Sequence, residues 1–195
     1  MKNRFEIWDA HCHIYPEKIA ERAVAGTDAF YGTTAACDGT VRHLLERGQA
    51  AGIDRFVVHS VATTPKQVRS INEFIAASVA QGEGKLIGLG TIHPASEDMA
   101  ADVGHLRDLG LHGIKIHPDI QQYRIDDPLF FPAYEICEAY DLPILIHTGD
   151  YRYDFSNPNR LLPVLRRFPK LRIVGAHFGG WSIWEALFIH ITLTF

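Results

Sequence analysis

Short apolar runs recur along the chain, and each is followed by a polar loop and a helical pattern. The runs are apolar almost throughout rather than alternating, which is typical of parallel strands buried on both faces. Six can be counted, at residues 5–9, 55–61, 86–92, 113–116, 143–147 and 172–177. The last five begin roughly 30 residues apart, the length of one βαβ unit. This regularity predicts an α/β fold, either a TIM (β/α)8 barrel or a doubly wound sheet.

Helical patterns fill the intervals between these runs. Thr64 and Pro65 supply an N-cap and a proline at the first helical position, and apolar residues then fall on one face. Asp127 begins another helix, which is predicted to end near Tyr140. Two further buried helix faces are marked by Val41, Leu44 and Leu45, and by Met99, Val103 and Leu106. No GxGxxG or GxxxxGK[ST] motif follows any strand, which argues against nucleotide binding.

Length and composition narrow the class of protein. A chain of 195 residues with 47% hydrophobic residues is predicted to form a single domain over residues 1–195. A net charge of -4 without a basic stripe argues against nucleic acid or an anionic membrane as partner, and favours a small-molecule substrate. The first ten residues lack a secretory h-region, so a cytoplasmic location is expected. The three cysteines are expected to be free thiols.

Eleven histidines are present, and several stand where a strand ends. His11 and His13 follow the first apolar run, and residues two apart in an extended segment point to the same side. Both rings can therefore reach one ion while Cys12 points away. The alternative is two polar loop residues that lie close by chance. His59 and His93 end the second and third strands and are expected to line the mouth of the same pocket.

The fifth and sixth strands end in His147 and His177, each followed closely by glycine. In a parallel barrel the carboxyl ends of the strands form the active-site face, and neutral imidazole is the commonest metal ligand. Each ring could instead be a buried histidine bonded to a carbonyl group. The same period-two spacing places Lys115 and His117 on one face at the end of the fourth strand.

Several of these polar side chains are candidates for substrate binding. A lysine within an apolar strand needs a counter-charge or a ligand, so Lys115 is expected either to pair with Asp9 or to contact substrate. His117 is expected to contact substrate beside it. Arg124 and Arg152 fall in the loops after the fourth and fifth strands, where a guanidinium could hold a carboxylate bidentately.

The ordered motifs resemble the amidohydrolase superfamily from about residue 5 to residue 184. They are WDAHCHIYP, GIKIHP, ILIHTGD and VGAHFGG. The sequence is most similar to the amidohydrolase-related branch, which contains metal-dependent hydrolases and decarboxylases of the aminocarboxymuconate-semialdehyde decarboxylase type. The resemblance implies a TIM (β/α)8 barrel, incomplete here with about six βα units.

The resemblance also implies the roles of individual residues. His11, His13 and His147 would bind one divalent metal ion, with zinc as the first expectation, and His177 would orient or activate the metal-bound water. In superfamily members with two ions a carboxylated lysine bridges them, and Lys115 could take that place. One ion is expected, because the branch resembled here typically uses one.

Hydrolysis of an amide or ester by metal-activated water is the first predicted function. Decarboxylation on the same site is the alternative. A third interpretation is an inactive remnant, because the family's aspartate on strand eight has no counterpart in this sequence. Residues 188–195 are predicted to reflect truncation or a shifted reading frame. Six strands would leave the first and last as open edges, so association into a homo-oligomer and weak activity are expected.

Overall fold

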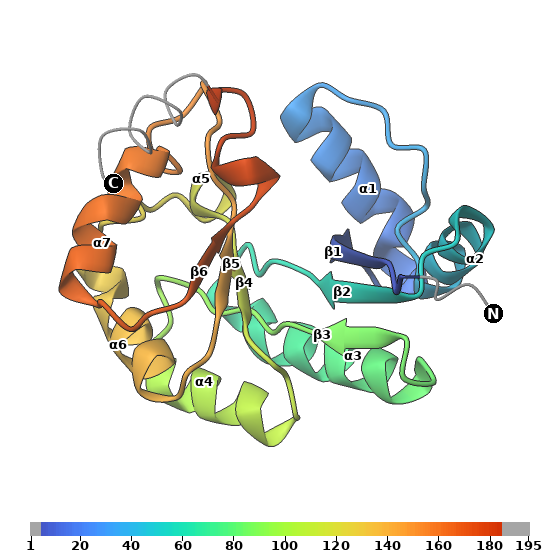
Figure 1. The fold of residues 1–195 in the computed structure, drawn as a ribbon, viewed down its shortest axis with the longest axis horizontal. Coiled ribbons are helices and arrows are strands. Elements are labelled where there is room, and N and C mark those ends of the chain that lie inside the picture. The colour runs from blue at the N-terminus through green and yellow to red at the C-terminus, as the bar shows by residue number, and fades with distance from the viewer. Residues whose placement is uncertain (1–4, 185–195) are drawn as a thin grey trace.

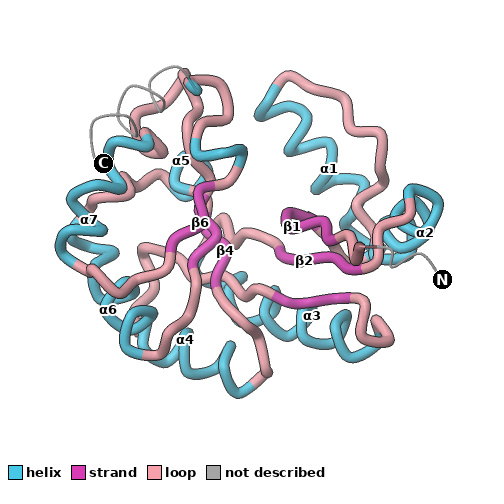
Figure 2. The backbone as a smooth tube through the Cα atoms, in the orientation of Figure 1, coloured by secondary structure: helices cyan, strands magenta, loops and turns pink. Residues whose placement is uncertain are grey.

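Six parallel strands follow one another in chain order in the computed structural model, which describes residues 5–184. Three form one sheet, β1 (Trp8–His13), β2 (Arg55–His59) and β3 (Leu86–Gly88), and three form a second, β4 (Ile114–Ile116), β5 (Ile144–Ile146) and β6 (Ile173–Gly175). A parallel bridge between Gly90 and Ile114 joins the two sheets. The result is part of a TIM barrel, with the strands at the centre and helices around them (Figures 1 and 2).

The helices lie between the strands as βα units require. They are α1 (Glu17–Tyr31), α2 (Val41–Ala51), α3 (Val68–Gln81), α4 (Met99–Asp108), α5 (Pro118–Gln121), α6 (Phe131–Ala139) and α7 (Leu161–Arg167). Four of them, α3, α4, α6 and α7, lie on the outer side of the strands in Figure 1. The predicted start at Thr64 is confirmed, because its side chain forms a capping box with Gln67 in a short 3-10 turn before α3.

The first strand begins later than predicted. Phe5 and Ile7 are 90% and 48% exposed, and the pairing with β2 starts at Trp8 and reaches His13. The predicted strand at residues 5–9 was therefore wrong in its bounds, because hydrophobicity alone did not reveal which residues have a strand neighbour. The correction matters for the site, since it places His11 and His13 within β1 rather than in the loop after it.

Burial separates the middle strands from the two outer ones. All residues of β4 and β5 are buried, whereas Trp8 in β1 and Val174 in β6 are 45% and 54% exposed. Within residues 5–184 neither β1 nor β6 has a second strand neighbour. The open edges are as expected, and association through them stays a prediction. Residues 188–195, which were predicted to reflect truncation or a shifted reading frame, lie outside the described residues.

The predicted state of the cysteines can be compared with the structure directly. Cys12 and Cys137 are buried and Cys37 is exposed, and all three thiols are free, as predicted. Among the described helices, none has the length and apolar character that a membrane crossing requires.

Candidate metal centre

A cavity of about 970 Å³ opens at the carboxyl ends of the strands, between them and α1. Its size is that of a small-molecule site. Five of the ten histidines within residues 5–184 line it, namely His11, His13, His117, His147 and His177. The remaining wall comes largely from α1 and α3. The structure therefore brings together five of the seven histidines that the sequence placed at the strand ends.

One group of imidazoles comes from β1 and β2. The Nε2 atoms of His11 and His13 lie 3.3 Å apart, and Cys12 between them is buried on the other side of the strand. His59 is paired in register with His13, and its ring centroid lies 4.4 Å from that of His13. One ligand atom from each of the three lies within 4.8 Å of the others. These three side chains could hold a metal ion.

His59 does not line the pocket mouth as predicted. It is completely buried, and neither ring nitrogen has a hydrogen-bond partner among the described residues. His93 is also buried and is not part of the cavity wall. The pairing of β2 with β1 places His59 beside His13. The sequence of β2 alone does not show which residue of β1 lies opposite His59.

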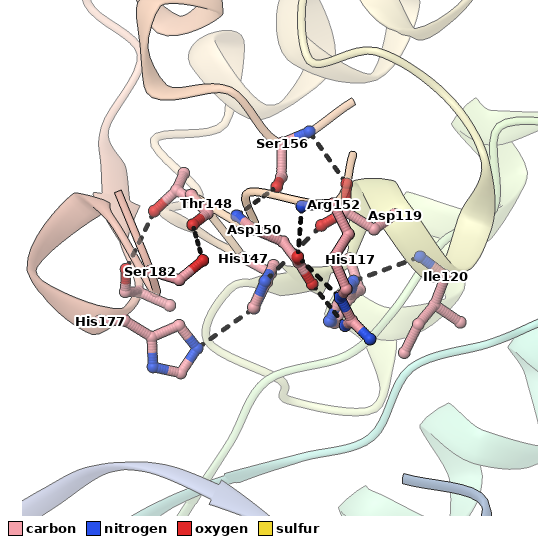
Figure 3. Close-up of polar contacts among 12 residues, drawn as sticks. His117, Asp119, Ile120, His147, Thr148, Asp150, Arg152, Ser156, His177 and Ser182 are labelled. Carbon is pink, nitrogen blue, oxygen red and sulfur yellow. Dashed lines mark hydrogen bonds and ion pairs between the residues drawn. The ribbon is translucent and has the colours of Figure 1, made fainter. Parts of the chain in front are cut away.

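A second group comes from the ends of β4 and β5. His117, Asp119 and His147 are each no more than 3% exposed, and they too offer ligand atoms within 4.8 Å of one another. The rings of His117 and His147 stack with centroids 3.9 Å apart and an interplanar angle of 9°. Figure 3 shows these side chains converging from the loops after the two strands.

His177 lies between the two groups. Its Nε2 atom is 3.1 Å from Nδ1 of His147, and its ring centroid is 5.0 Å from that of His11. The chain turns sharply here, with His177 and Phe178 at φ values of 58° and 54°, in the left-handed region that costs about 1–3 kcal/mol per residue. Such strain is typical of residues held for function. The turn keeps the His177 ring against His147.

The imidazoles are neutral near pH 7. Burial, followed by the charge of Lys115, lowers the pKa of His11 and of His147 to about 2 and that of His177 to about 4. A neutral ring keeps a lone pair, which is what a metal ligand needs. The donor set and its protonation state fit a nitrogen-rich divalent metal site.

Lys115 is fully buried, and its Nζ atom has no partner among the described residues. The predicted ion pair with Asp9 was therefore wrong. The Asp9 carboxylate instead accepts a hydrogen bond from the backbone N–H of His11, at 3.1 Å. Burial lowers the pKa of Lys115 to about 7, so its ammonium group gives up its proton far more readily than usual.

The two candidate arginines lie elsewhere. Arg124 is 54% exposed beside Asp126, and the structure does not bring it to the cavity. Arg152 makes two hydrogen bonds to Asp150, at 2.9 Å and 2.6 Å, and donates a third to the carbonyl oxygen of Phe30 in α1. Its guanidinium is thus occupied in holding the loop after β5 against α1. Neither guanidinium forms part of the cavity wall.

Sequence reasoning missed Tyr31, at the end of α1. Its hydroxyl oxygen lies 2.5 Å from Nε2 of His117 and 3.4 Å from Nδ1 of His147. It also missed Asp119 and the two cations Lys18 and Arg22, which line the cavity from α1. The available signal was the segment EKIAERAVAGTDAFY, rich in good helix formers and followed by glycine.

The fold and the site define a TIM-barrel protein with a histidine-rich centre at the carboxyl ends of its strands. A family model for amidohydrolases matches residues 8–191. The chain belongs to the amidohydrolase family.

Individual proteins of known sequence or structure are also similar to this chain. A 2-amino-3-carboxymuconate-6-semialdehyde decarboxylase from Dictyostelium discoideum is 28% identical in an alignment 134 residues long, which covers 56% of this chain and 37% of that protein. An uncharacterised TIM-barrel protein from Bordetella bronchiseptica superposes with a TM-score of 0.76 at 20% identity, over 97% of this chain and 72% of its own.

A third similar protein was solved with manganese and a nitrobenzoic acid. It is a 5-carboxyvanillate decarboxylase from Novosphingobium aromaticivorans, with a TM-score of 0.70 at 16% identity, over 98% of this chain and 71% of its own. The chain thus spans a little over a third of the curated relative and about seven-tenths of the solved barrels.

Proposed function

We propose that this chain belongs to a metal-dependent decarboxylase that removes CO2 from a small carboxylic acid. The named relatives support this over the amide or ester hydrolysis that the sequence favoured, because both the curated relative and the manganese-containing structure carry decarboxylase names. Hydrolysis remains the alternative, since the same fold and the same kind of metal centre serve both reactions.

The observation that carries the proposal is the charge of the cavity wall. Lys18 and Arg22 are one helical turn apart on α1, and both line the cavity that holds the histidines. Within residues 5–184 neither makes an ion pair with another side chain. Ile19, Phe30 and Trp181 add apolar surface to the wall. An anionic substrate with an apolar body suits this lining.

His11, His13 and His147 would hold the metal, with His59 buried alongside the first two. When bound, a divalent ion supplies positive charge that stabilises a carboxylate and the negative charge developing next to it. The donor set suits zinc, and manganese is the ion named for one similar structure. Elemental analysis decides between them.

The protein's own groups would handle the rest of the reaction. The carbon–carbon bond to the carboxylate breaks, CO2 leaves, and the electron pair stays on the ring or chain carbon until that carbon takes up a proton. His177 is the residue that we expect to pass this proton on from solvent, because it lines the cavity and an imidazole can take up a proton at one ring nitrogen while it gives one up from the other. Lys18 and Arg22 would hold a second acidic group of the substrate.

The proposal is tested by supplying the metal-loaded protein with a panel of aromatic carboxylic acids and, in parallel, a panel of amides and lactones. Metal-dependent CO2 release from one or more acids is expected. Hydrolysis without CO2 release would favour the alternative. Turnover of neither panel by a folded, metal-containing protein would support the third interpretation, an inactive remnant.

A further inference from the structure

Asp119 is a buried carboxylate whose two oxygen atoms are in different surroundings. Oδ1 accepts a hydrogen bond from the backbone N–H of Ser156, at 3.1 Å. Oδ2 has no hydrogen-bond partner among the described residues, and the side chain is 0% exposed. A buried carboxylate oxygen without a donor is costly, so a donor facing Oδ2 is required.

A ring nitrogen of His147 faces Oδ2. Its Nε2 atom lies 3.6 Å away, is equally buried, and also has no hydrogen-bond partner among the described residues. The opposite ring nitrogen, Nδ1, faces the cavity, 3.1 Å from Nε2 of His177. Figure 3 shows the ring between Asp119 on one side and His177 on the other. His147 therefore has one nitrogen toward the protein and one toward the cavity.

Hydrogen bonding around Tyr31 indicates where the proton of His147 lies. Nδ1 of His117 accepts from the backbone N–H of Ile120 at 3.3 Å, so in a neutral His117 ring Nε2 carries the hydrogen. That N–H donates to the Tyr31 oxygen at 2.5 Å, which leaves the Tyr31 hydroxyl hydrogen to donate to Nδ1 of His147 at 3.4 Å. Nδ1 of His147 must then hold a lone pair, and its hydrogen must be on Nε2.

We propose that Asp119 is a positioning residue that holds His147 in the Nε2–H tautomer and so keeps Nδ1 free to bind the metal. The inference rests on the metal site of the proposed function. Histidines that bind metals usually donate their other ring N–H to a carboxylate or carbonyl group, which fixes the orientation of the ring and makes it a better ligand.

A direct metal site on His117, Asp119 and His147 is the competing interpretation, because their ligand atoms lie within 4.8 Å of one another. It requires a free lone pair on His117. Nδ1 of His117 already accepts from Ile120, and Nε2 meets the Tyr31 hydroxyl group. Only Asp119 and His147 would remain as donors, fewer than a divalent ion needs.

The first test is nuclear magnetic resonance of the metal-free full chain with ¹⁵N-labelled histidine at neutral pH. The His147 signals are assigned by their loss in a His147→Gln variant. A ring with hydrogen on Nε2 is expected. Hydrogen on Nδ1 would overturn the proposal. This measurement needs neither metal nor substrate, so it stands even if the decarboxylase proposal fails.

The second test is titration with Zn²⁺ or Mn²⁺ alone. Asp119→Ala is expected to bind the ion about 10–100-fold more weakly and to lose the preference for Nε2–H, while Asp119→Glu recovers most of the affinity. Asp154→Ala, at an exposed carboxylate in the loop after β5, is the matched control and should bind as the original chain does. Unchanged binding by Asp119→Ala would overturn the proposal. It would also be overturned if the original chain binds two ions and Asp119→Ala binds one, because Asp119 would then be a direct ligand of the second ion. If Asp119→Ala does not fold, Asp119→Asn replaces it under the same criteria.

Discussion

The two halves of the sheet each carry a group of ligand side chains, but in different surroundings. In the β1–β2–β3 half, His11 and His13 lie on an edge strand, and within residues 5–184 their ring nitrogens make a hydrogen-bond contact only with each other. In the β4–β5–β6 half, His147 is buried, and its ring lies between Asp119, 3.6 Å from Nε2, and the Tyr31 and His177 groups, 3.4 Å and 3.1 Å from Nδ1. We therefore expect a bound ion to fix the His11 and His13 rings more than it fixes the ring of His147.

The ring of His177 lies near both His147 and His11. Replacing it should have the largest effect on activity. His177→Asn is expected to lower the rate of CO2 release by about 10²–10⁴-fold, because general acid–base help is lost. Metal content should be kept, since the proposed ligands remain. His112→Asn, at an exposed position far from the cavity wall, is the control. Activity of His177→Asn near that of the control would show that proton transfer runs through another group.

Lowering the pH should reduce the free energy of unfolding of the metal-free protein, through histidines in both halves of the sheet. The folded-state pKa of His11 and of His147 is depressed from 6.5 to about 2. Each contributes stability that is present above pH 6.5 and is lost as the pH falls toward the folded pKa, because the unfolded chain binds the protons first. Each ring can contribute up to about 1.4 kcal/mol per pH unit.

Urea unfolding at a series of pH values measures this slope. Replacing both rings, in His11→Gln with His147→Gln, should flatten the curve below pH 6.5. A free energy of unfolding in the original chain that does not change between neutrality and acid pH would contradict the expected burial of neutral imidazoles.

Lys18 and Arg22 of α1, in the first half of the chain, should bind the negative charge of the substrate. Arg22→Ala is expected to raise KM for an acidic substrate by about 10–100-fold with little change in kcat, because a charged hydrogen bond worth about 1.5–3 kcal/mol is lost. Arg47→Ala, at an exposed arginine of α2 outside the cavity, is the control. Equal KM values for the two variants would remove α1 from substrate binding.

The smallest effect is expected in the second half, at Lys115. Lys115→Met should raise the free energy of unfolding of the metal-free protein by about 1–3 kcal/mol at neutral pH, since an unpaired buried cation gives way to an apolar chain of similar length. Chemical denaturation measures the change. A less stable variant would mean that Lys115 has a partner that stabilises the folded state.

The sequence predicted the strands better than the wall of the cavity. Apolar runs and the parallel-sheet rule were enough to bring His11, His147 and His177 to one end of the strands, because strand periodicity is a local property. Arg124 and Arg152 could not be placed in the same way. The direction of a loop side chain depends on distant contacts, such as the bond from Arg152 to Phe30.

Long-range contacts also explain the residues that were missed. Tyr31 is 86 residues from His117 along the chain, and His59 meets His13 only through strand register. No local pattern encodes either contact. The position of Asp119 beside His147 likewise depends on how the loops after β4 and β5 lie relative to each other.

Counting the metal ions bound per chain tests most directly whether the two halves share one site. Elemental analysis is made on the purified chain, on the His11→Ala, His13→Ala double variant, and on His147→Ala. One divalent ion per chain is predicted, and it should be lost from the double variant and from His147→Ala alike. Two ions per chain, with each variant losing only one, would contradict a shared centre, and so would equal metal content in all three proteins.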